Sequence, residues 1–250
     1  MASALPAALR SEVLKARTTP TALGLAAATV GLSVLAVLLH AVGLPASELS
    51  THANQQRVLV EAGENIGAVF AALLGALAMT AEFRHGTIRP TFLSTPRRTT
   101  VVTAKALLSL AGGAMFGLLA TATSSLAGAI AFSSRGLASH LDGTDYLRAI
   151  VGGTAAASLW ALIGLAVGAI VRNQVGATAG LFVWLLIVEN LLVDGAPSVS
   201  KVLPGSLGQA LAGQRTGTLH AAVGASLLLI AYAAVALALA TRLTVRRDVT

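Results

Sequence analysis

AEFRHGTIRPTFLSTPRRTTVVTAK, residues 81–105, is a polar and strongly basic stretch between two long apolar runs. The flanking runs, 58–79 and 106–132, are each close to the roughly 20 residues that a helix needs to cross a bilayer. A stretch of this kind between two such runs predicts a loop outside the membrane. We therefore interpret the chain as a membrane protein and expect this loop to contact something beyond the bilayer.

The composition of the whole chain agrees with that interpretation. Of its 250 residues, 55% are hydrophobic and 11% are charged, and the mean hydropathy is +0.79, whereas about a quarter of an ordinary soluble domain is charged. The absence of cysteine excludes disulfides and thiolate chemistry. The net charge of +7 comes from basic residues in short connectors, so membrane topology explains it and nucleic-acid binding is not expected.

Six apolar segments have the length and composition of membrane-spanning helices. They are residues 21–42, 58–79, 106–132, 149–171, 176–192 and 219–241. No strand alternation with turn punctuation competes with them, so the predicted fold is an all-α integral membrane bundle of six transmembrane helices. We expect one transmembrane domain, 1–250, made of an interfacial helix (1–20), the bundle (21–241) and a cytoplasmic tail (242–250).

The segment before the first span has the pattern of a short amphipathic helix at the membrane interface. Leu5, Leu9 and Val13 recur at every fourth residue, and the charged side chains, Glu12 among them, fall mostly on other faces. Pro20 is expected to end this helix. The alternative is a frayed tail with ordinary basic residues.

The distribution of basic residues predicts the orientation in the membrane. Six spans place both termini on one side, and cytoplasmic connectors carry an excess of Lys and Arg. Twelve of the 17 basic residues fall on the side of the termini and of the 81–105 stretch. We therefore expect a multi-pass protein of the plasma membrane with both termini in the cytoplasm.

Small residues in the second predicted span indicate close helix packing. Gly63, Gly67, Ala71 and Gly75 recur at a spacing of four, which lets two helices approach closely in lipid. Gly113/Gly117, Gly164/Gly168 and Gly176/Gly180 repeat the pattern. We expect a tightly packed bundle, and the ladder from 63 to 75 is also a candidate contact face for a second chain.

The 81–105 stretch itself predicts a short cytoplasmic helix. Gly86 can break the helix that leaves the membrane, and Thr87 can act as the N-cap of a new helix that ends near Pro96. Ile88, Phe92 and Leu93 would then dock in a cleft of a soluble partner. The alternative is an ordinary basic loop whose arginines meet lipid phosphates.

The order of residues in this stretch resembles the loop between the second and third helices of ABC-2-type transporter permeases. The residues that carry the resemblance are Glu82-Phe83-x-x-Gly86-Thr87, then Pro96-Arg97 or Pro96-x-Arg98, then Lys105 opening a span. The N-terminal SEVLKARTTPTALGL, with Glu12 and Lys15, is similar to that family's amphipathic entry. With six spans and cytoplasmic termini, the resemblance covers essentially the whole chain.

The resemblance implies a function that the residue pattern alone does not reach. It implies a coupling helix seated on a separate ATP-binding cassette ATPase dimer, and two permease chains, identical or different, that pair around a transport pathway. The implied coupling residues are Glu82, Phe83, Gly86, Thr87, Arg89, Phe92, Pro96, Arg97 and Lys105. ATP and Mg²⁺ would belong to the partner, because this chain has no G-x-x-x-x-G-K-[ST] loop and no cofactor of its own is expected.

The function expected on this basis is export of a hydrophobic or amphiphilic compound, such as a drug, antibiotic, lipid or glycan precursor. Two alternatives belong to other classes. An accessory or immunity-type membrane protein would bind a partner without a transport pathway of its own. An intramembrane enzyme would carry paired ionisable groups within its spans, which are nearly free of them away from their ends, so catalytic residues are not expected.

Polar residues at the predicted outer ends of the second and fifth spans suggest a substrate site. Glu61, Glu64, Asn65, Glu189 and Asn190 would form an acidic external vestibule for a cationic or amphiphilic compound. The alternative is that they mark the membrane interface. The external histidines come from separate connectors without short ligand spacing, so no metal site is expected.

Overall fold

The computed structural model is all-α in the part of the chain that it describes, residues 4–45, 53–95, 97–213 and 222–246. The first half contains α1 (Ala4–Thr18), α2 (Thr21–Gly43), α4 (Ala53–Arg84), α5 (Ile88–Ser94) and α6 (Arg98–Ser134). The second half contains α7 (Gly143–Val171), α8 (Gln174–Val183), the π-helical turn η1 (Trp184–Val188), α9 (Glu189–Gly195), α10 (Pro197–Ser200), α11 (Pro204–Ala212) and α12 (Ala222–Arg246).

Six stretches among the described residues are long and apolar enough to cross a membrane. They are Thr21–Gly43, Gln55–Arg84, Arg98–Ser134, Gly143–Val171, Gln174–Gly195 and Ala222–Arg246. Each overlaps one of the six segments predicted from the sequence. The chain is therefore a multi-pass membrane protein by the length and composition of its helices.

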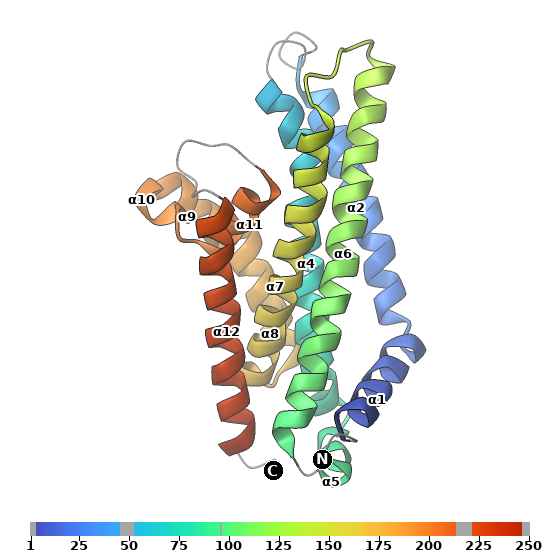
Figure 1. Cartoon of the computed structure of the whole chain (residues 1–250), viewed down its shortest axis with the longest axis vertical. Helices are drawn as coiled ribbons and strands as arrows, with labels where there is room; N and C mark the ends of the chain where they lie inside the picture. Colours follow the sequence, from blue (N-terminus) through green and yellow to red (C-terminus); the bar gives the residue numbers. More distant parts are fainter. Residues whose placement is uncertain (1–3, 46–52, 96, 214–221, 247–250) are drawn as a thin grey trace.

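Three long helices, α4, α6 and α7, form the centre of the bundle, and α2 and α12 flank them on opposite sides (Figure 1). The described start of the chain in α1, the short helix α5 and the end of α12 lie at one end of the bundle. Arg98 at the start of α6 donates to the carbonyl oxygen of Thr244 near the end of α12 at 3.0 Å. This arrangement agrees with an even number of spans.

Glycines bring the three central helices into backbone contact. A Cβ on Gly63 or Gly75 would lie closer than 3.0 Å to a carbonyl oxygen, that of Ala120 on α6 or of Ala161 on α7, respectively. Gly164 of α7 approaches the carbonyl oxygen of Ala72 on α4 in the same way. Close packing through the 63–75 ladder is therefore confirmed, since small residues let helices approach at this distance.

The ladder is covered within the chain, which corrects one expectation. Gly63, Gly67, Ala71 and Gly75 are all buried against α6 and α7. They do not offer a free contact face to a second chain. Gly180 also departs from the predicted pattern, because nothing lies within 4 Å of the position that its Cβ would take.

The helix ends differ from prediction where polar residues continue a helix beyond its apolar run. α6 begins at Arg98, two turns before the predicted start at 106, and α12 continues to Arg246 instead of ending at 241. Pro20 separates α1 from α2 as predicted. The segment before α12 is divided into α10 and α11, because Pro204 disfavours helical backbone at the residue before it and Leu203 is extended.

Candidate functional site

Four charged side chains form a compact network at the end of the bundle where α1, α4 and α6 meet. The Lys105 ammonium of α6 lies 2.8 Å from Glu12 Oε2 of α1 and 2.7 Å from Glu82 Oε1 of α4. The Lys15 ammonium lies 2.7 Å from Glu12 Oε1 and 2.6 Å from Glu82 Oε1. Two cations and two anions thus cancel, and each carboxylate pairs with both ammonium groups.

Burial makes this network sensitive to charge balance. The Lys105 side chain is 1% exposed, and it also donates to the carbonyl oxygen of Ala78 at 2.9 Å. Glu12 and Glu82 are buried as well. A buried ion costs several kcal/mol to desolvate, so each of these groups depends on its partners to remain charged.

Lys15 closes the network from the solvent side. Partial burial acts to lower the pKa of its ammonium, but hydrogen bonds and charge attraction from Glu12 and Glu82 outweigh burial and raise that pKa above its ordinary value of 10.5. The side chain is 42% exposed, so solvent screens these interactions in part. Lys15 is therefore the group through which this network meets the solvent.

The turn into α5 begins at a glycine. Gly86 has φ +68°, a left-handed conformation that glycine adopts without steric cost, and it ends the long helix α4 as predicted. Thr87 occupies the N-cap position of α5, but its side chain makes no cap hydrogen bond, so its predicted capping role is wrong. Its carbonyl oxygen instead accepts from the backbone N–H of Thr91 at 3.1 Å.

One side of α5 packs on the bundle, which corrects the expected docking face. Ile88 is 3% exposed in a cluster with Met79 and Ala106, and Phe92 packs half-buried against the same cluster. The Arg98 guanidinium lies over the Phe92 ring at 5.1 Å, a cation–π contact that ties α5 to α6. Ile88 and Phe92 therefore hold α5 in place instead of facing outward.

The other side of α5 is open to solvent. Leu93 is 83% exposed, and Arg89 is exposed beside it. Arg97 is also exposed immediately before α6. Pro96 lies outside the described residues. The exposed face of α5 thus consists of a leucine flanked by basic side chains, and the opposite face of the helix packs on the bundle.

A second cation–π contact joins the end of α4 to the end of α7. The Arg172 guanidinium lies over the Phe83 ring at 5.3 Å. Arg172 is the C-cap of α7 and is left-handed, with φ 58°. Of the predicted coupling residues, Glu82, Phe83 and Lys105 therefore connect helices within the bundle. Arg89 and Arg97 are exposed instead.

A separate group of three buried glutamates lies toward the other end of α4. Glu61 and Glu64 are 4% and 1% exposed, and Glu189 of α9 is 5% exposed. The carboxyls of Glu189 and Glu61 act electrostatically on that of Glu64. Among the described residues neither oxygen of Glu64 has a hydrogen-bond partner.

The short helix α11 covers these carboxyls. Glu189 Oε1 accepts hydrogen bonds from the backbone N–H groups of Gly205, at 2.5 Å, and Ser206, at 3.1 Å, in the first turn of α11. A Cβ on Gly208 would lie closer than 3.0 Å to Glu64 Oε1. Gly208 thus lies directly against the Glu64 carboxyl, and Glu189 satisfies N–H groups that a helix start leaves unpaired.

The predicted vestibule residues therefore divide into two sets. The three glutamates come together but are buried beneath α11 instead of lining an open surface. Asn65 and Asn190 are exposed; Asn190 of α9 donates to the carbonyl oxygen of Leu186 in the preceding turn η1 at 3.0 Å. Within the described part of the chain, no group of three or more His, Asp or Glu is arranged to hold a metal ion.

Sequence reasoning missed the role of Glu12 because it placed this residue away from the apolar face of α1. Position 12 is three residues after Leu9, so it shares a helical face with Leu9. An acidic residue on that face, together with a lysine inside the apolar run VVTAKALLSL, was the available signal for a buried ion pair. Neither residue, however, indicates from the sequence which residue it pairs with.

The fold and the two charged clusters define an α-helical membrane bundle with a short solvent-facing helix at one end. No protein-family model matches the chain, and no curated protein matches it either.

Proposed function

We propose that the chain is the permease subunit of an ATP-driven exporter of the ABC-2 type. The observation that carries this proposal is the mounting of α5, whose inner face is fixed by Ile88 and Phe92 while Leu93 and Arg89 face solvent. A helix held rigidly on two spans and exposed on its other side suits the transfer of force from a soluble partner. The sequence resemblance of the 81–105 stretch points to the same role.

In this proposal the partner is an ATP-binding cassette ATPase dimer, which holds ATP and Mg²⁺ and docks on the exposed side of α5. Both termini and α5 lie in the cytoplasm, α1 lies at the membrane interface, and a second permease chain completes the pathway in the plasma membrane. The cargo is a hydrophobic or amphiphilic compound. No step of ATP hydrolysis falls on this chain, which has no phosphate-binding loop.

The charge network explains how movement of α5 would reach the bundle. In the sequence, α5 connects α4 to α6. Lys105 joins α6 to Glu82 of α4 and to Glu12 of α1. Displacement of α5 would therefore move three helices together. Closure of the partner shifts the bundle between two states only if its docking surface binds those states with different affinity.

Co-purification tests the proposal. A tagged chain extracted from its native membrane is expected to retain an ATP-binding subunit and its ATPase activity. Leu93→Asp with Arg89→Glu should release that subunit, because both changes oppose an apolar and basic contact surface. Arg148→Glu changes an exposed arginine near the start of α7 and serves as the control.

The result also separates the proposal from the accessory-protein alternative. An exporter subunit should support ATP-dependent movement of a compound in sealed vesicles, and the double variant should abolish it. The vesicles would be screened with amphiphilic dyes and antibiotics. Retention of the ATPase without ATP-dependent movement of any of these compounds would favour the accessory protein. Retention of the ATPase by the double variant would refute α5 as the docking helix.

A further inference from the structure

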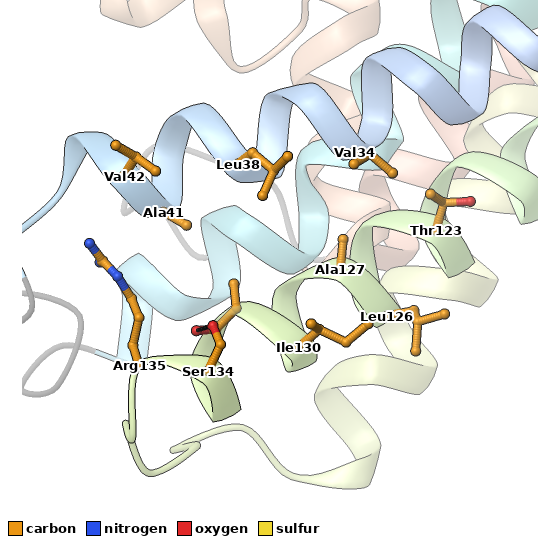
Figure 2. Close-up of a pocket in the computed structure, with 11 residues that line it drawn as sticks. Val34, Leu38, Ala41, Val42, Thr123, Leu126, Ala127, Ile130, Ser134 and Arg135 are labelled. Atoms are coloured by element: carbon orange, nitrogen blue, oxygen red, sulfur yellow. Dashed lines mark hydrogen bonds between the residues drawn. The ribbon is translucent and has the colours of Figure 1, made fainter.

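An apolar groove of about 360 Å³ runs between α2 and α6, on the flank of the bundle away from α12 (Figures 1 and 2). Its floor is made of small side chains, including Ala41 and Ala127. Its walls are larger side chains that are half or more exposed, such as Leu38, Leu126 and Ile130. The groove is therefore open at the surface of candidate membrane-spanning helices.

The length of the groove matches one leaflet of a bilayer. Along α6 it extends from Thr123 to Arg135, and twelve residues of helix rise about 18 Å. Half of the hydrocarbon core is about 15 Å thick. A single extended acyl chain of one leaflet therefore has the reach to follow the groove along α6.

The groove has a charged end. Arg135 directly follows α6, and its guanidinium reaches toward the end of α2, where it donates to the carbonyl oxygen of Leu44 at 3.2 Å (Figure 2). The side chain is exposed, and among the described residues it forms no salt bridge. Guanidinium groups pair well with phosphate oxygens through several N–H donors.

We propose that this groove binds one acyl chain of an anionic glycerophospholipid, with the lipid phosphate held by Arg135. The apolar lining, the reach of one leaflet and the cation at the mouth together fit the two parts of such a lipid. The proposal concerns a different face from α5 and does not depend on export. It assigns a lipid site to the chain itself.

The size of the groove distinguishes a lipid chain from a partner helix. A helix about 10 Å wide and about 18 Å long fills roughly 1,400 Å³. The groove holds about 360 Å³, which is the lower range for a small-molecule site. A hydrocarbon chain can lie along it, whereas a helix could insert side chains alone.

Native mass spectrometry of the delipidated full-length chain in detergent tests the site. The probes are dioleoyl-phosphatidylglycerol and dioleoyl-phosphatidylcholine, added separately at increasing concentration. We expect one phosphatidylglycerol to bind about fivefold more tightly than phosphatidylcholine, the effect of one basic residue near an anionic headgroup. Arg135→Gln should reduce phosphatidylglycerol binding to the phosphatidylcholine level, and Arg148→Gln, an exposed arginine outside the groove, should not.

Three further measurements separate the headgroup, the acyl chain and a second protein chain. Excess glycerol 3-phosphate should leave the bound lipid in place, and Ala127→Leu should weaken both lipids because it fills the floor. Since the chain has no cysteine, Leu126→Cys provides a single thiol in the groove wall. When this variant is oxidised in lipid vesicles, it should form no disulfide-linked dimer.

Each opposite result overturns the proposal. Unchanged binding by Arg135→Gln would remove the phosphate contact, and equal binding of the two lipids would remove the preference for an anionic headgroup. Displacement by glycerol 3-phosphate would indicate a headgroup site without the groove. A disulfide-linked dimer of Leu126→Cys would show that a second copy covers this face. If Ala127→Leu fails to fold, the Arg135→Gln comparison still decides the result.

Discussion

The Lys105 ammonium lies 2.8 Å from Glu12 Oε2, although 93 residues separate them in the sequence. This contact ties the helix before the first span to the beginning of the third. Because Glu82 also pairs with Lys105 at 2.7 Å, the contact joins three helices at one point. The charge balance of this point is the basis for the first two predictions.

Lys105→Met should destabilise the fold strongly, because it leaves Glu12 and Glu82 to share one half-exposed lysine. Breaking a buried ion pair from one side costs about 3–5 kcal/mol. The double variant Lys105→Met with Glu82→Gln restores the balance of one cation and one anion and should recover part of that loss. Unfolding in detergent would be followed by tryptophan fluorescence, and equal stability of the single and double variants would contradict the charge-balance explanation.

The stabilisation that Lys15 gives to the folded protein should be lost at alkaline pH. Its pKa is raised above 10.5 in the folded chain, so its contribution is complete below pH 10.5 and is lost as pH rises through the folded pKa. The stability difference between wild type and Lys15→Met should therefore be constant from pH 7 to about pH 10 and narrow above that range. Lys201→Met, an exposed lysine between α10 and α11, is the control. A difference that grows at high pH would show that the sign is wrong.

Gly75→Ala and Gly164→Ala should each destabilise the bundle by about 1–3 kcal/mol, since the added methyl forces apart helices that touch through their backbones. Gly31→Ala is the matched control, because nothing lies within 4 Å of its Cβ position in α2. That change should be neutral or stabilising, as alanine is the better helix former. The same loss at all three positions in thermal unfolding would mean that packing is not the cause.

Glu189 should anchor α11 through its acceptor oxygen. Glu189→Leu leaves the N–H groups of Gly205 and Ser206 without their buried acceptor, a loss of about 1–3 kcal/mol for each. Glu189→Gln keeps one carbonyl oxygen at that position and should lose less. Limited proteolysis of the 196–213 segment measures the effect, and indistinguishable cleavage of the two variants would exclude an anchoring role.

The sequence predicts the parts of this fold that depend on local pattern. Apolar length identifies all six spans, and the break at Gly86 follows from glycine's conformational freedom. The sequence places the start of α6 too late, because Arg98 and Lys105 interrupt the apolar pattern before residue 106.

Contacts between distant segments could not be predicted in the same way. Nothing near Lys105 indicates that its partner is Glu12 and not a lipid phosphate, because both satisfy a lysine at a membrane interface. The burial of Glu64 likewise depends on Gly208, which reaches it from a segment that the sequence left without a role. Pattern identifies the unusual residue, and tertiary structure supplies its partner.

The central claim, that the exposed side of α5 docks on an ATP-binding subunit, is tested most directly by site-specific cross-linking. Leu93→Cys provides a single thiol in a chain without cysteine, to which a photoreactive group can be attached in native membranes. We predict one cross-linked protein that contains a nucleotide-binding loop, with a yield that changes when ATP and vanadate are added. Cross-links to lipid alone, or to proteins without that loop, would contradict the account.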